Sequence, residues 1–174
     1  MAPVDGIKRF TTEYVIPEDR IRLSLESTDG QMRVLWLTRR LCTRLVPQIV
    51  KVLGKRPQIY GDAVQAPTDN AQRRSQMDAL GRLENQDPVR PEGDVEEHLV
   101  TVMSMRMNAQ AILLDFKSGE DNLIQTLPFP EAAMRQWLVM LHVAFRKGEW
   151  KDDIWPDWIV IKGREDGPDP VRLN

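Results

Sequence analysis

Several features that would reveal a function are missing from this sequence. Cys42 is the only cysteine, which excludes an intrachain disulfide. The opening residues contain no apolar run of the kind that a secretory signal needs. No stretch approaches the roughly 18 uninterrupted apolar residues of a membrane span. We therefore expect a cytoplasmic protein.

The sequence also has little net charge and none of the short motifs of common catalytic sites. Its 24 Lys and Arg are balanced by 26 Asp and Glu, so no overall field favours nucleic acid, a membrane or an acidic substrate. P-loop, dinucleotide-binding, HExxH and GxSxG motifs are absent. Function must therefore be sought in local surfaces.

Enough apolar residues are present for a substantial core. With 174 residues and 41 % hydrophobic content, we expect one domain spanning residues 1–174. Two stretches, Met32–Leu53 and Asn122–Phe145, each read as a strand that runs directly into an amphipathic helix. These two units organise the prediction of the fold.

The first half, residues 1–54, has the pattern of three strands and a helix. Strands are predicted at 10–16, 20–27 and 32–37, with Asp29-Gly30 supplying the hairpin turn. Thr38 is a plausible N-cap for the helix that follows. Pro47 lies too deep in that helix to be a first-turn proline, so we expect a kink or a break there.

Residues 55–94 form a polar insert containing four prolines and many Gln, Asn and Asp. One interpretation is a solvated helix over 69–84, with its apolar stripe formed by Ala71, Met77, Leu80 and Leu83. The other is a mobile linker. The composition does not separate the two.

The second half, residues 95–148, repeats the order of the first. Strands are predicted at 99–107, 111–117 and 122–127, followed by a helix over 130–147. Its core stripe is Met134, Trp137, Leu138, Leu141 and Phe145. The predicted fold class is α+β, with about six mainly antiparallel strands in a pseudo-duplicated βββα arrangement and two main helices packed on the sheet around a shared core. Internal duplication and chance similarity of two hairpins both remain open.

The first candidate surface is the basic helix over 39–56. No acid occurs between Asp29 and Asp62, whereas this stretch carries seven positive charges. Its outer face could bind an acidic protein surface or nucleic acid. We favour a third interpretation, in which the acids of 62–97, nine against four arginines, pair with these charges within the molecule.

The second candidate is the tryptophan-rich tail, residues 149–174. Trp150, Trp155 and Trp158 could be a motif that docks into another protein, since tryptophan is an efficient interface anchor. We favour the alternative in which the tail lies across this protein's own sheet and helps to fill its core. The Pro, Gly and Asp-rich end beyond it is expected to fray.

Three weaker candidates are groups of residues that could act in catalysis or bind a metal ion. Cys42, near a helix start, could be an activated thiol beside His142, although an inert core thiol is the favoured interpretation. A cluster of Asp94, Glu96, Glu97 and His98 could accept a divalent ion, but its spacing matches no ligand pattern. The alternating Met103, Met105 and Met107 could bind Cu(I), but such residues more often fill a core or an interface.

These patterns predict a non-enzymatic interaction module, an adaptor or accessory subunit, that binds a protein partner or a second copy of itself. A nucleic-acid-binding protein using the basic helix and an enzyme using Cys42 or the acidic cluster are the alternatives. No cofactor or metal is expected. The predicted partner-binding residues are Arg39, Arg40, Arg44, Lys51, Trp150, Trp155 and Trp158.

Overall fold

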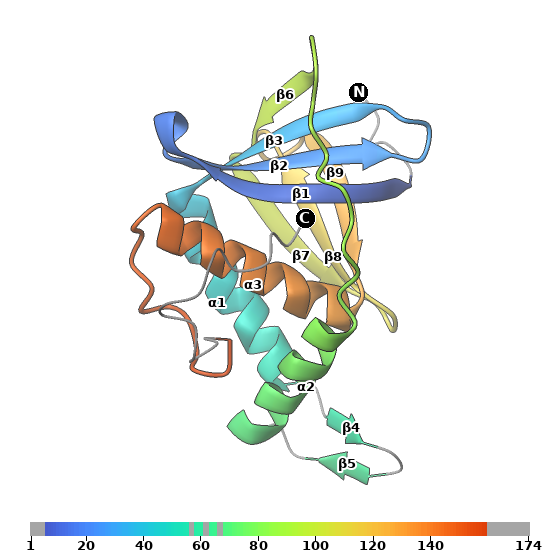
Figure 1. The fold of residues 1–174 in the computed structure, drawn as a ribbon, viewed down its shortest axis with the longest axis vertical. Coiled ribbons are helices and arrows are strands. Elements are labelled where there is room, and N and C mark those ends of the chain that lie inside the picture. The colour runs from blue at the N-terminus through green and yellow to red at the C-terminus, as the bar shows by residue number, and fades with distance from the viewer. Residues whose placement is uncertain (1–5, 56–57, 61–62, 66–67, 160–174) are drawn as a thin grey trace.

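Within the residues that the structure describes, the fold is α+β, as the sequence predicts, with seven strands in two main sheets, a separate short strand pair and three α-helices (Figure 1). The computed structural model describes residues 6–55, 58–60, 63–65 and 68–159. The sheets are built from β1 (Ile7–Val15), β2 (Arg20–Ser27), β3 (Met32–Thr38), β6 (Glu96–Leu99), β7 (Val102–Met107), β8 (Ile112–Lys117) and β9 (Leu123–Phe129). The helices are α1 (Arg39–Lys55), α2 (Asp69–Gly81) and α3 (Glu131–Lys147), and β4 (Gln58–Tyr60) and β5 (Ala63–Gln65) form a separate pair.

The first sheet has the order β1-β2-β3-β6. Its first three strands are antiparallel neighbours, and β2 occupies the residues that the alternation predicts. Ile21, Leu23 and Leu25 are at most 1 % exposed and face the core. The predicted half-buried strand is therefore confirmed on its apolar face.

One predicted strand is wrong, because residues 99–107 do not form a single strand. The chain changes sheets at Val100 and Thr101: the Val100 N–H donates to the Trp36 carbonyl at 3.0 Å, and the Thr101 N–H donates to the Lys117 carbonyl at 2.9 Å. The residues before this point form β6, which pairs parallel with β3. The residues after it form β7, so the expected single sheet is divided in two.

The second sheet is the antiparallel meander β7-β8-β9. Arg33 of β3 is 5 % exposed and links the two sheets through its Nη1, which donates to the Ile124 carbonyl at 2.9 Å. Leu114 and Phe116 of β8 join the same cluster of buried apolar side chains as Leu23 and its neighbours in the first sheet. Both sheets thus face one interior.

The sequence predicts the bounds and the buried faces of the three helices with different success. Helix α3 buries the predicted stripe completely, and Trp137 on it stacks on Phe129 with ring centroids 5.0 Å apart. Helix α1 begins where predicted, with Thr38 Oγ1 accepting from the Leu41 N–H at 3.2 Å, and it continues through Pro47 without a break. Among the described residues, each helix is too short or too polar to span a bilayer.

Helix α2 lies within the predicted range but buries a different face. Met77, expected in its apolar stripe, is 60 % exposed, whereas Gln72 and Gln76 are at most 2 % exposed. The Gln72 side chain donates to the Leu53 carbonyl at 3.1 Å, and the Gln76 side chain donates to the Arg135 carbonyl at 2.8 Å. Hydrogen bonds from these two buried amides to α1 and α3 therefore determine which face of α2 is buried.

Residues 82–95 leave α2 as an extended segment, here called the strap, that runs past β1, β2 and β3 in Figure 1. Val89 is 3 % exposed, and its N–H donates to Thr11 Oγ1 at 2.7 Å. Arg9 of β1 donates to the Asp87 carbonyl at 2.9 Å. This contact explains why Ser24, on the face of β2 away from the core, is only 1 % exposed.

Candidate interaction surface

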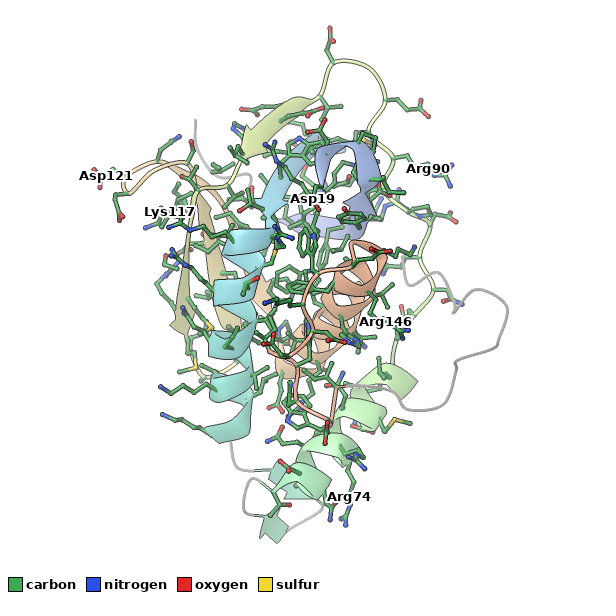
Figure 2. The ribbon with its side chains drawn as sticks, turned by 90° about the vertical axis from the view of Figure 1, so that its left-hand side faces the viewer. Asp19, Arg74, Arg90, Lys117, Asp121 and Arg146 are labelled. Carbon is green, nitrogen blue, oxygen red and sulfur yellow. The ribbon has the colours of Figure 1, made fainter. Side chains whose placement is uncertain are left out.

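Helix α1 separates its apolar and charged residues onto opposite sides. Its buried residues recur at helical spacing and are Cys42, Leu45, Val46, Ile49 and Leu53. Four exposed cations lie on the other side and Arg39 is exposed at the first position of the helix; together we call them the α1 basic face: Arg39, Arg40, Arg44, Lys51 and Lys55. Figure 2 looks toward this helix, with α3 beside it. The apolar stripe thus fixes the direction in which the cations point.

The α1 basic face makes no ion pair with any residue that the structure describes. Elsewhere acids do find partners, as Glu26 does with Lys8 and Arg9. The favoured pairing of this face with insert acids is therefore not found among the described residues. The insert instead places its described acids along α2 and the strap. Arg56 and Asp62, which also formed part of that prediction, lie outside the described residues.

One acid, Asp19 at the turn before β2, has a pKa that a cation of the α1 basic face affects. Its pKa is lowered first by the hydrogen bond from the Trp150 indole, next by the one from Tyr14, and also by the charge of Arg39. Both hydrogen bonds are 2.8 Å long. Asp19 is thus hydrogen-bonded to neutral donors, and Arg39 is the only cation of the α1 basic face among the causes of its pKa shift.

The three tryptophans of the predicted docking motif are buried. Trp150, Trp155 and Trp158 are 4 %, 7 % and 7 % exposed. Trp150 and Trp155 pack edge-on against Phe145 of α3, with centroids 4.9 and 5.2 Å away, and Trp158 lies against the guanidinium of Arg135. Their rings are therefore core contacts in this structure, which leaves the α1 basic face as the accessible part of the predicted site. The tail after Ile159 lies outside the described residues.

Cys42 does not have the environment of a catalytic thiol. It is fully buried in the core cluster, and burial raises its pKa to about 12. His142 is 8 % exposed and packs against the Trp155 ring at 5.0 Å. A buried thiol with a raised pKa is a poor nucleophile at neutral pH, so its environment does not favour a catalytic role for Cys42.

His142 should make stability depend on pH. Burial, and next the charge of Arg146, lower its pKa below the ordinary 6.5, against a smaller opposite effect of Asp152. The unfolded chain then takes up a proton first as pH falls, so the free energy of unfolding drops below about pH 6.5, by at most about 1.4 kcal/mol per pH unit. Urea unfolding at pH 7, 6 and 5 should show a steeper fall for the native chain than for H142F. Equal slopes would contradict the prediction.

The acidic cluster does not converge on one point. Glu96 lies 3.2 Å from Arg33 and 2.8 Å from His98, whereas Glu97 accepts from the Trp36 indole at 2.7 Å. Neighbouring residues of a strand point to opposite sides, which separates the two glutamates. Across the described part of the chain, no group of three or more His, Cys, Asp or Glu side chains is arranged to hold a metal ion.

The methionine strand is divided between core and solvent. Met103 and Met105 of β7 pack against the core cluster, opposite Phe116 and Leu114 in the register. Met107, at the end of the strand, is 59 % exposed. The first two therefore act as core filling, which is the more common use of methionine.

Sequence reasoning missed a cleft of about 350 Å³ to which α1 contributes no lining residue. Its lining comes from β1, from the start of the strap, from the end of β9 and from α3. These segments are far apart in the chain, so no local signal could have indicated it.

Comparisons of the chain with models of protein families, with curated proteins and with solved structures found no match. The candidate surfaces must therefore be judged on their own chemistry.

Proposed function

We propose that this chain is a non-enzymatic interaction module that contacts an acidic protein surface through the α1 basic face. The observation that carries this proposal is a set of five exposed cations on a single helix, four of them on the side opposite its apolar stripe, with no ion-pair partner among the described residues. Clustered like charges repel one another, and an acidic partner relieves that repulsion while it gains attraction.

The geometry of α1 supports an extended contact. Its 17 residues correspond to a length of roughly 25 Å at 1.5 Å per residue. The apolar stripe anchors the helix in the core, so the cations are presented on a rigid element. An acidic helix or strand of a partner fits such a row better than a small anion does.

Nucleic acid is the rival ligand for the same face. Binding of single strands usually combines cations with exposed aromatic rings on which bases stack. The exposed α1 residues include Thr43, Pro47 and Gln48 but no aromatic residue. This composition favours a protein partner.

We also propose that the two βββα units are related by internal duplication. In each, three successive strands precede a helix of 17 residues, namely β1-β2-β3 before α1 and β7-β8-β9 before α3. Both hairpin turns contain a glycine with positive φ, Gly30 at 82° and Gly119 at 84°. An internally repeated layout makes a second copy of the chain a natural alternative partner.

The test reverses charge on one face and leaves the rest of the surface alone. The variant R39E/R40E/R44E/K51E changes the α1 basic face, and R73E/R74E/R90E/K147E makes the same charge change at four exposed positions elsewhere. Each protein is immobilised and used to capture partners from native lysate, with and without nuclease, over a range of salt concentrations. Self-association is followed by light scattering.

We expect a captured protein that the native chain and the control variant retain and the α1 variant loses, with binding weakening as salt rises. Stability should change little, because exposed substitutions usually shift it by less than about 0.5 kcal/mol each. Capture that is identical for both variants would contradict the proposal. Capture that nuclease abolishes would favour the nucleic-acid rival.

A further inference from the structure

The cleft beside β1 combines an apolar lining with a charged rim. Phe10, Leu127 and Met140 line it, together with Trp137, whose relative exposure is 0 %. A volume of about 350 Å³ lies within the range of small-molecule sites. It is far too small for a folded partner.

The apolar wall is held rigidly before any ligand arrives. Besides its stack on Phe129, Trp137 donates its indole N–H to Thr12 Oγ1 at 3.0 Å. Phe10 packs edge-on against the same Phe129 ring at 5.6 Å. A preformed wall reduces the entropy that binding would cost.

The charged side chains of the cleft are mostly cationic. Lys8, Arg9 and Arg82 line it, against one acid, Glu84. Arg9 is committed to Glu26 and to the strap carbonyl of Asp87. Lys8 pairs with Glu26 at 3.2 Å and Arg82 with Asp78 at 2.7 Å, but the Lys8 and Arg82 side chains are 59 % and 69 % exposed, so each ammonium or guanidinium group can also reach a ligand's anion.

We propose that this cleft binds a small amphipathic monoanion, with an apolar chain of medium length against Phe10, Leu127 and Met140 and its carboxylate between Lys8 and Arg82. The apolar walls supply affinity and the two cations select the sign of the charge. This site is separate from the α1 basic face, because none of its lining residues belongs to α1.

The test uses the fluorescent anion 1-anilinonaphthalene-8-sulfonate, displaced by decanoate or by decyltrimethylammonium. M140W fills the cleft, whereas M77W makes the same change at a 60 % exposed position outside it. K8E/R82E reverses the rim charge, and K51E/K55E makes the matched change on α1. Circular dichroism and melting temperature verify that each variant is folded.

We expect one saturable site from which decanoate displaces the probe at least tenfold more effectively than the cation does. M140W and K8E/R82E should each weaken decanoate at least fivefold, while both controls stay within twofold of the native chain. The proposal is overturned if the native chain shows no saturable binding, or if the two alkyl ions compete equally. It is also overturned if K51E/K55E weakens binding as much as K8E/R82E does. If M140W fails to fold, the comparison of the two charge variants decides.

Discussion

Replacing Trp150 with alanine should lower the free energy of unfolding by about 3–5 kcal/mol, the usual cost of truncating a buried tryptophan. Trp150 is 4 % exposed and packs edge-on between Phe145 and Tyr14, whose centroids lie 4.9 and 5.7 Å away. Its indole N–H also donates to Asp19 at 2.8 Å. The side chain thus connects the tail to α3 and to the turn before β2. Urea unfolding followed by circular dichroism measures the change.

Two further variants separate the contribution of the indole hydrogen bond from that of the buried ring. W150F keeps an aromatic ring but removes the indole donor, so it should cost about 1.5–3 kcal/mol, the value of one hydrogen bond to a charged group. W36A removes a tryptophan that is only partly buried on β3 and should cost less than W150A. A loss below about 1 kcal/mol for W150A would mean that the tail is detached in solution. The tryptophans would then again be available for a partner.

Replacing Val89 with aspartate should detach the strap from the outer face of the first sheet. Val89 is 3 % exposed; Thr11, which accepts its N–H, is 6 % exposed, and Val34, in the same row of the sheet two strands away, is 1 % exposed. A carboxylate buried there loses its hydration, and Arg9, the cation that contacts the strap, is already engaged by Glu26 and the Asp87 carbonyl, so we expect a cost of about 2–4 kcal/mol or release of the segment into water. Hydrogen exchange of residues 84–95 should accelerate at least tenfold.

R90D is the matched control, because Arg90 is exposed at the next position of the strap. Its stability should stay within about 0.5 kcal/mol of that of the native chain. If V89D exchanges and unfolds as R90D does, the strap does not protect the sheet. The buried state of Ser24 and Val34 would then need another explanation.

The elements that the sequence predicts well are those whose periodicity is local. The alternation of Ile21, Leu23 and Leu25 predicts both bounds of β2, and the stripe containing Trp137 predicts the buried side of α3. The spacing of apolar residues in α1 likewise indicates that Arg40 and its neighbours point outward. In each case one segment carries all the information that is needed.

The elements that the sequence misses depend on distant partners. Residues 99–107 favour a strand throughout, and only the carbonyls of Trp36 and Lys117 determine where that run divides between two sheets. The buried face of α2 depends on acceptors 19 residues before Gln72 and 59 residues after Gln76. Whether the α1 cations are paired also depends on the path of the insert, which its polar composition does not determine.

The parallel pairing of β3 with β6 has a consequence for synthesis on the ribosome. Residues 39–95 separate the two strands, so one edge of β3 stays without its hydrogen-bonding partner until β6 has emerged from the ribosome. At roughly 5–20 residues per second this wait is on the order of 3 to 11 s. During that interval the nascent chain exposes an unpaired, strongly apolar strand, and a chaperone or the growing chain itself must shield it from neighbouring nascent chains.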